Sequence, residues 1–339
     1  MKLNTLKKSI AMALLVPAIL TGCTQGSAAS TNDAETNKNE AGTENKTYKI
    51  GISQLVEHPS LDQAREGFID GLKELGVEVQ VDVANAQGDT ANAQIISEKF
   101  VKDEVDMIYS IATLSTQAAK QATKETKIPV VFSSVTDPVY SQIVESAEKI
   151  ENVTGVTDKV EASEILKSAK DLKENTKVIG IIYNTGESNS EVQVEEVKAA
   201  AAELGMTVET VGITTVNDIP QAVNTLAKTI DVMYIISDNV VASAIDLVAN
   251  LCIEKNIVTL STIESQASNG ILMGNGLNYY ELGKQAAQMA KKILVDQVEI
   301  SNVHVEQPSG LNKIVNVETM EKLGITKENK AFEGAEFLD

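Results

Sequence analysis

The chain has 339 residues but few of the side chains on which catalytic, metal-binding and disulfide-stabilised proteins most depend. It contains two cysteines, two histidines and no tryptophan, and only 4% of its residues are aromatic. His58 and His304 lie far apart in the sequence, with no cysteine at metal-ligand spacing, so we expect no zinc site. A Ser-His-Asp triad would have to use one of these histidines, and no Gly-x-Ser-x-Gly motif occurs. We therefore predict that the chain is not an enzyme and carries no metal or cofactor.

Basic residues are also in short supply. Lysines and arginines number 29 against 48 aspartates and glutamates, which gives a formal net charge of -19. Nucleic acids and anionic membranes attract basic protein surfaces, so neither is an expected partner. No Walker phosphate-binding sequence is present, and Gly274-Asn275-Gly276 is too short for a dinucleotide-binding fingerprint.

The N-terminus is typical of an export signal. Lys2, Lys7 and Lys8 precede an apolar run over 10–20 that is too short to span a bilayer. Leu20-Thr21-Gly22-Cys23 follows and resembles the bacterial lipobox, in which the signal is cleaved before the cysteine and the thiol receives a lipid such as palmitate. We predict a lipoprotein signal peptide over 1–22 and a lipid on Cys23 that anchors the protein outside the cell membrane. The alternative is an ordinary secretory signal with an incidental cysteine.

If Cys23 carries a lipid, Cys252 has no partner and no disulfide stabilises the fold. Cys252 lies in an apolar helical stretch, which predicts a buried, unreactive thiol. The segment 23–46 is rich in Ser, Thr, Asn, Ala, Gly and Glu and shows no apolar periodicity, so we predict a flexible tether. The remainder exceeds the size at which one hydrophobic core normally suffices, and two domains are expected.

Short apolar runs alternate with amphipathic segments from Tyr48 onward, a pattern that predicts parallel sheets flanked by helices. In the first half we expect strands at 48–53, 77–83, 105–110 and 129–133, and helices at 61–75, 90–102 and 115–124. Asp89-Thr90 and Ser115-Thr116 are the expected N-caps of the last two helices. In the second half we expect strands at 178–183, 207–213, 232–236, 257–260 and 270–273, and helices at 187–204, 219–228, 240–255 and 279–295. The tail over 302–323 alternates valines with polar residues and ends in a short helix.

The two halves repeat one design: Glu74-Leu75-Gly76 closes the opening helix of one and Glu203-Leu204-Gly205 that of the other. We predict an α/β fold with two doubly wound parallel-sheet lobes around a cleft. The N-terminal lobe is assigned 47–136 and 265–307, and the C-terminal lobe 137–264 and 308–339, although the lobe that the tail joins stays open. Connections near 134–138, Ile263 and Gln307-Pro308 would form a hinge.

Ligands of open parallel sheets bind at the carboxyl ends of the strands, and the loops expected there are unusually polar. The helix N-terminus at Thr113, Ser115 and Thr116 suits a ligand carboxylate, and Asp238 suits an ammonium group, with Asn239 and Glu264 in the same register. The alternative is that these residues only cap helices and form turns. The candidate ligand-binding residues are Gln54, Glu57, His58, Thr113, Ser115, Thr116, Ser134, Thr136, Asn184, Glu187, Ser188, Asn189, Asp238, Asn239, Glu264 and Asn275.

Several linked motifs resemble the ABC transporter substrate-binding proteins of tryptophan and tyrosine uptake. They are 54–62 with Arg65-Glu66-Gly67-Phe68, Ser134-Val135-Thr136-Asp137-Pro138, Thr154-Gly155-Val156-Thr157-Asp158, 183–190 and Tyr280-Glu281-Leu282-Gly283. The resemblance runs from Tyr48 to the tail and implies a type I periplasmic-binding-protein fold that closes on an amino acid. It also implies that the loops of Thr113 and Thr136 meet the carboxylate and that the loop of Asp238 meets the ammonium. Phe132, Tyr183 and Tyr279 are candidate stacking partners for an aromatic ligand.

The expected function is therefore that of a monomeric extracytoplasmic binding protein of an ABC importer, which captures an aromatic amino acid (Trp, Tyr or Phe) and delivers it to a membrane permease. Two alternatives stay open, a sensory binder of the same fold that signals to a membrane receptor and a binder of a different small zwitterion. An extracytoplasmic enzyme would instead show turnover.

Overall fold

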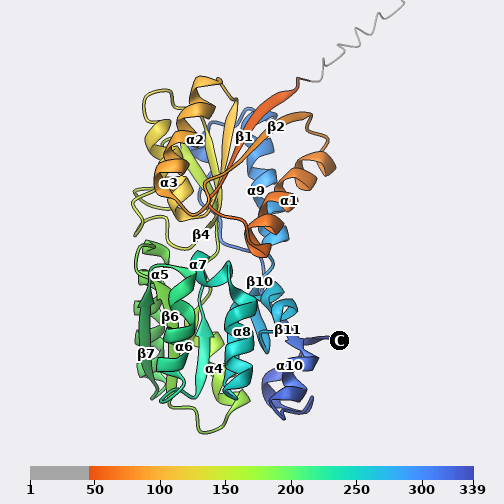
Figure 1. Ribbon diagram of the computed structural model, residues 1–339. Helices are drawn as coiled ribbons and strands as arrows, with labels where there is room; N and C mark the ends of the chain where they lie inside the picture. Colours follow the sequence, from red (N-terminus) through yellow and green to blue (C-terminus); the bar gives the residue numbers. More distant parts are fainter. Residues whose placement is uncertain (1–45) are drawn as a thin grey trace, which may run out of the picture. The chain divides into compact units, whose positions relative to one another are not determined.

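The computed structural model describes residues 46–339. The predicted signal peptide over 1–22, the predicted lipid site at Cys23 and the predicted tether as far as residue 45 lie outside the described residues. Two lobes are each built around a β-sheet with helices on both faces (Figure 1). None of the helices within residues 46–339 is long and apolar enough to cross a membrane.

The sheet of the first lobe is wholly parallel, with strand order β2-β1-β3-β4-β5. Its strands are β1 (Tyr48–Gln54), β2 (Val79–Asn85), β3 (Met107–Ile111), β4 (Val130–Val135) and β5 (Val153–Thr157). Every residue of β3, β4 and β5 is buried, as expected for strands covered on both faces. This half of the prediction, an α/β lobe with a doubly wound parallel sheet, is confirmed.

Four helices cover this sheet: α1 (Pro59–Glu74), α2 (Thr90–Lys102), α3 (Thr113–Ala122) and α9 (Tyr279–Leu294), which returns from far along the chain to pack against α1. Helices α1 and α9 meet at Gly67 and Gly283, where a Cβ atom would overlap a backbone carbonyl of the other helix. Glycine therefore permits this close approach and holds the late helix on the first lobe.

The second lobe contains the strands β6 (Val178–Asn184), β7 (Thr207–Ile213), β8 (Val232–Ile235), β9 (Val258–Ile263), β10 (Met273–Leu277), β11 (Asn312–Asn316) and β12 (Glu336–Leu338). Their order is β12-β11-β10-β9-β8-β6-β7, and neighbours are parallel except β10 and β11. Helices α4 (Ala162–Leu172) and α5 (Ser188–Glu203) pack on one face. Helices α6 (Ile219–Leu226) and α8 (Ile245–Glu254) pack on the other, so this sheet is also doubly wound, as predicted.

Several predicted elements differ from the structure. The cap at Asp89 is confirmed, because its carboxylate accepts a 2.8 Å hydrogen bond from the Asn92 amide. The cap at Ser115-Thr116 is wrong: Ala112 turns the chain at a φ of 81° directly after β3, so α3 begins at Thr113. The helix predicted over 240–255 is divided into α7 (Asn239–Ala242) and α8. Strand β5 and helix α4 were not predicted.

Within residues 46–339 the chain crosses between the lobes three times: between β5 and α4, between β10 and α9, and between Glu306 and β11. The first two crossings lie later than predicted, so 137–157 belongs to the first lobe and 265–277 to the second. The reason is strand pairing, since β5 adds to β4 at the edge of the first sheet and β10 adds to β9 in the second. The tail joins the second lobe through β11, α10 (Val317–Lys322) and β12.

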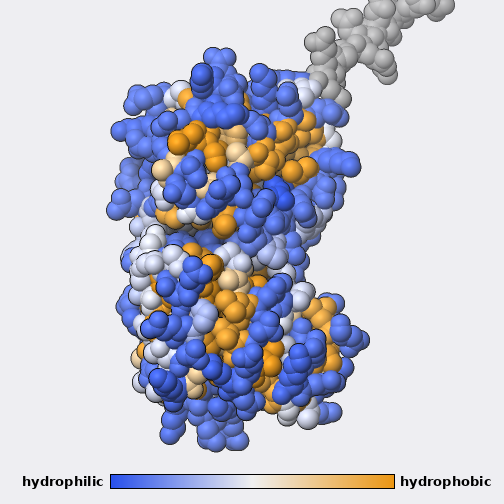
Figure 2. Space-filling model, viewed as in Figure 1, coloured by the Kyte–Doolittle hydropathy of each residue, from blue (hydrophilic) through white to orange (hydrophobic). Residues whose placement is uncertain are grey.

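The predicted burial of Cys252 is confirmed, and burial raises the pKa of its thiol to about 12, so the thiolate is scarce at neutral pH. The visible face of the protein is mostly hydrophilic (Figure 2), as the net charge of -19 leads one to expect. Apolar side chains also reach solvent on the first lobe, where Val83 and Ile95 are exposed.

Candidate functional site

The carboxyl ends of strands from both sheets meet at a pocket between the lobes. Residues of β4 and of α1 with its N-cap line one side of the pocket. Residues of α5, of α7 and of the segment between β8 and α7 line the other, and two crossing segments close it. The lining residues are His58, Leu61, Ser134, Asp158, Asn189, Ser237, Asp238, Asn239, Ala242, Ile263 and Tyr279. The pocket measures about 10 Å³, the space of about one water molecule, because side chains from both lobes nearly fill it.

Side chains of the two lobes touch across this pocket. The imidazole Nε2 of His58 lies 3.3 Å from Oδ1 of Asn239. At the rim, the hydroxyls of Ser141 and Ser188 lie 3.1 Å apart. These contacts join residues of α1 and of the segment after β4 to residues of α7 and α5, so the lobes are closed on each other.

Asp238 is the most firmly held carboxylate of the pocket and is 1% exposed. Its Oδ1 accepts a hydrogen bond from the Val241 amide at 2.8 Å, which caps α7. Its Oδ2 accepts from the Asn184 amide at 2.5 Å and from the Ser190 hydroxyl at 2.7 Å. Burial, and after it the nearby Glu187 carboxylate, raises the pKa of Asp238 to about 7. A cation placed beside Asp238 would favour its charged form.

Glu187 organises the amides around Asp238. This buried carboxylate accepts hydrogen bonds from the side-chain amides of Asn184 at 3.0 Å, Asn189 at 3.1 Å and Asn239 at 2.5 Å. The Asn189 Oδ1 atom is buried and has no hydrogen-bond partner among the described residues. The second lobe thus presents carboxylates and an unpaired carbonyl oxygen, all of which accept hydrogen bonds.

The first lobe has four buried hydroxyls near the carboxyl ends of its strands, and of these only that of Ser134 lines the pocket. Ser53 at the end of β1, Thr113 and Ser115 in the first turn of α3, and Ser134 at the end of β4 each have a buried hydroxyl without a partner in the described part of the chain. A buried polar group left unpaired costs about 1–3 kcal/mol. The first turn of α3 also has backbone N–H groups that no helical carbonyl accepts. This side is therefore rich in groups that can donate to an anion.

His58 stands at the N-terminus of α1, between these two sides. Its Nδ1 is buried and has no partner within residues 46–339. Burial lowers the pKa of His58 to about 4, so the ring is neutral near pH 7. A neutral ring can donate from one nitrogen and accept at the other, but it cannot form an ion pair.

Asp158 and Tyr279 occupy two of the crossing segments and bond to each other. The Tyr279 hydroxyl donates to Oδ2 of Asp158 at 2.6 Å and lies 3.4 Å from the Ser237 hydroxyl. The Thr136 hydroxyl donates to Oδ1 of Asp158 at 2.8 Å, so Thr136 serves this carboxyl group and does not line the pocket. Burial raises the pKa of Asp158. Asp158 was not predicted to be a site residue, although it ends the motif over 154–158 that carried part of the family resemblance.

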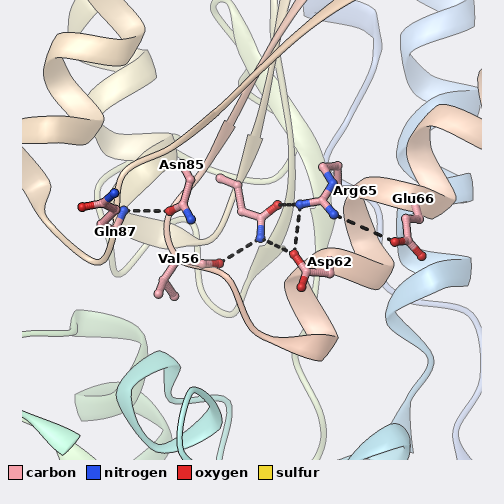
Figure 3. A network of polar contacts seen from close by, with 7 residues as sticks. Val56, Asp62, Arg65, Glu66, Asn85 and Gln87 are labelled. Atoms are coloured by element: carbon pink, nitrogen blue, oxygen red, sulfur yellow. Dashed lines mark hydrogen bonds and ion pairs between the residues drawn. The ribbon is translucent and has the colours of Figure 1, made fainter.

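Other predicted residues have partners outside the pocket. Gln54 donates to Asp62 at 2.8 Å and accepts from Arg65 at 2.7 Å, within the polar network of Figure 3. The Thr116 hydroxyl donates a 2.9 Å hydrogen bond to the carbonyl of Ala112, one turn earlier in the chain. Glu57, which precedes the pocket residue His58, is exposed. Two further predicted ligand-binding residues, Glu264 and Asn275, line a separate groove and not this pocket. The candidate stacking residues Phe132 and Tyr183 pack in or against the cores of their lobes.

The comparison with known proteins gives concordant matches. A family model described as ABC transporter substrate binding protein matches residues 49–336. A tyrosine-binding protein of Clostridioides difficile (strain R20291) is 36% identical over 323 residues, which cover 94% of this chain and 92% of the relative. An ABC domain from Streptococcus pneumoniae, solved in complex with L-Trp, is 30% identical with a TM-score of 0.81, over 86% of this chain and 100% of the other.

A ligand-free, open structure of a substrate-binding protein with adhesive properties from Clostridium difficile is 37% identical, over 86% of this chain and 99% of the other. Its TM-score is only 0.67, although its sequence is more similar than that of the L-Trp complex. By this measure the overall structure of this chain is more similar to that of the L-Trp complex.

Proposed function

Because the chain belongs to the family of ABC transporter substrate-binding proteins, we propose that it captures an aromatic amino acid between its lobes and delivers it to a membrane permease. The family resemblance inferred from the sequence is confirmed by the match over 49–336. The family consists of binding proteins, in agreement with the prediction that the chain is not an enzyme.

The observation that carries this proposal is the division of polar groups between the two sides of the junction. The first lobe offers unpaired hydroxyls at Ser53, Thr113, Ser115 and Ser134, and the second offers carboxylates and amides around Asp238. A ligand with an anionic and a cationic end would satisfy one set with each end. An α-amino acid has these two ends on a single carbon atom, so the two lobes would have to close to reach both.

We assign the ligand carboxylate to the hydroxyls and to the first turn of α3, and the ligand ammonium to Asp238 and Asn189. An ammonium group has three donor hydrogens and no acceptor. The raised pKa of Asp238 supports this assignment, because a cation would compensate the burial of its charge. Asp158 lies in the same pocket and is a second candidate partner of the ammonium.

The ligand side chain has apolar and aromatic neighbours within the same pocket. Leu61, Ala242, Ile263 and Tyr279 line it. The two similar proteins named above bind, by their descriptions, tyrosine and L-Trp, which favours an aromatic ligand here. A pocket of about 10 Å³ cannot hold any amino acid, so the lobes must open for the ligand to enter and side chains must move to admit it.

We further propose that the protein acts as a monomer outside the membrane, with Cys23 lipidated. The signal over 1–22 and the lipobox supply the support, and globomycin inhibition of signal-peptide cleavage would test the lipid. We expect globomycin to cause a larger, uncleaved precursor of the wild-type protein to accumulate. The size of the Cys23→Ala protein should be the same in treated and untreated cells.

The ligand assignment can be tested by a thermal-shift screen of the full chain against all amino acids. A ligand that binds only the folded state at 100 times its dissociation constant stabilises it by about 2.7 kcal/mol. We expect tyrosine, tryptophan or phenylalanine to raise the melting temperature most, and calorimetry to give one site. A response to sugars alone would refute the ligand class. Loss of labelled tyrosine uptake in a deletion strain would test delivery to a permease.

A further inference from the structure

The second lobe carries a groove that shares no lining residue with the pocket between the lobes. It has a volume of about 780 Å³ and lies between α4, strands β10 and β11, and the C-terminal segment. Binding sites for small molecules typically measure about 300–1,000 Å³. The groove is therefore large enough for an organic ligand and much larger than a single ion requires.

Glu264 gives the groove a buried carboxylate, one of whose two oxygens has no hydrogen-bond partner within residues 46–339. It directly follows β9, is 6% exposed and lines the groove. Its Oε1 accepts a 2.5 Å hydrogen bond from the Asn278 side-chain amide, whereas its Oε2 is buried without a partner among the described residues. Removing a carboxylate oxygen from water without replacing its hydrogen bonds is unfavourable. A hydrogen-bond donor on a bound ligand would therefore be favoured at Oε2 of Glu264.

The other groups of the groove define which donor fits. Its lining holds five carboxylates but only two lysines, Lys167 and Lys313. Asp171 is already paired with Lys330 at 2.9 Å, and Asn275 donates to Ser168 at 3.1 Å. Glu333 and Glu336 also line the groove and belong to the C-terminal segment. The surplus of carboxylates favours a positively charged ligand over an anion or a sugar.

We propose that this groove is a second binding site, for a small organic amine whose primary ammonium group donates to Oε2 of Glu264. A linear polyamine is the preferred candidate, because its further ammonium groups would be attracted by the other carboxylates of the groove, which include Glu333 and Glu336. This site is independent of the amino-acid site proposed above.

The test is calorimetric titration of spermidine into the full chain at an ionic strength of about 0.15 M, where screening beyond about 8 Å suppresses loose attraction to the acidic surface. We expect one site in the wild type. Glu264→Gln preserves the side chain's size and the acceptor for Asn278, and should weaken spermidine binding at least about tenfold. The matched variant Glu125→Gln removes an exposed carboxylate of the first lobe that does not line the groove, and should change the affinity less than about threefold.

Tyrosine is titrated into the same samples, so that failure of the amino-acid site and failure of the groove are seen separately. No spermidine binding by the wild type, or equal weakening in both variants, would overturn the proposal. Displacement of spermidine by tyrosine would place the amine between the lobes, and displacement by calcium would assign the groove to a metal ion; either result refutes it. Hydrogen exchange of the wild type supplies a readout without variants, since spermidine should slow exchange in 264–278.

Discussion

The sharpest test of the pocket is replacement of the Asp238 carboxyl group by an amide. Asp238→Asn preserves the size of the side chain and its capping ability, because asparagine and aspartate are equally good N-caps. It removes the charge that we assign to the ligand ammonium. A hydrogen bond to a charged group contributes about 1.5–3 kcal/mol. The affinity for the amino acid should therefore fall about 10-fold to 150-fold, at 1.4 kcal/mol per factor of ten.

The same change also affects the fold. An amide at position 238 can still accept from Val241, which lies 2.8 Å from Oδ1, but it turns an NH₂ group toward the Asn184 amide and the Ser190 hydroxyl. One donor is then left unpaired, at a cost of about 1–3 kcal/mol in the free energy of unfolding. Urea unfolding measures this cost, and circular dichroism shows whether the variant is folded when its affinity is determined.

The pH dependence separates the charge from the packing. Asp238 has a pKa of about 7 in the folded, ligand-free protein, against about 3.9 in an unfolded chain. Since the ammonium requires the charged carboxylate, wild-type affinity should fall by up to about tenfold per pH unit below pH 7. The folded state holds this proton more tightly than the unfolded chain does. The stability from Asp238 is therefore fully present below about pH 4 and is lost as pH rises through about 7.

Calorimetry with tyrosine between about pH 5 and about pH 8 measures this profile for the wild type and for Asp238→Asn, which should show a flat profile. Asp89→Asn is the matched control, because Asp89 also caps a helix through a 2.8 Å bond but is exposed and does not line the pocket. Its affinity and pH profile should equal those of the wild type. An Asp238→Asn protein that is folded and binds tyrosine normally would refute the assignment of the ammonium.

Two further predictions concern the stability of the folded protein. Tyr279→Phe removes the donor at 2.6 Å from Asp158 and should lower the free energy of unfolding by about 1–3 kcal/mol in urea titration; unchanged stability would show that water replaces the hydroxyl at no cost. Gly283→Ala forces a Cβ into the Ala64 carbonyl of α1 and should destabilise the fold by about 1–3 kcal/mol. At Gly186 a Cβ would meet only the Asn184 side-chain oxygen, at an ordinary contact distance of 3.4 Å, so Gly186→Ala should stay within about 0.5 kcal/mol. Equal effects of the two alanines would mean that α1 and α9 adjust freely.

The sheets could be predicted wherever a strand contains its own apolar run. Strand β6, Val-Ile-Gly-Ile-Ile-Tyr-Asn, has such a run and was predicted within one residue of its observed bounds. Strand β5, Val-Thr-Gly-Val-Thr, has no such run. It is held by pairing with β4 and by the Thr154 hydroxyl, which donates at 2.7 Å to the carbonyl of Val303, far along the chain. Interactions over such sequence separations leave no local pattern, and the first crossing was misplaced as a result.

For the candidate site, too, the loops could be predicted from the local sequence, but the direction of each side chain could not. The rule that ligands lie at the carboxyl ends of parallel strands selected loops that the structure brings together, and His58, Ser134 and Asp238 from these loops line the pocket. It does not say to which side each residue of a loop points. Ile263, the last residue of β9, lines the pocket, whereas Glu264, which begins the turn after the strand, lines the groove.

The closed arrangement is held by contacts that are too weak to fix it without help. The His58–Asn239 and Ser141–Ser188 hydrogen bonds join neutral groups at 3.3 Å and 3.1 Å, and each is worth about 1 kcal/mol. Shifting a lobe equilibrium from 1:99 to 99:1 takes about 5.5 kcal/mol. Two or three charge-assisted bonds from one zwitterion, at about 1.5–3 kcal/mol each, can supply that amount. They do so only when both lobes contribute, because the donors for the carboxylate and the acceptors for the ammonium lie on opposite sides of the junction, so capture of the ligand and closure of the lobes must be one event.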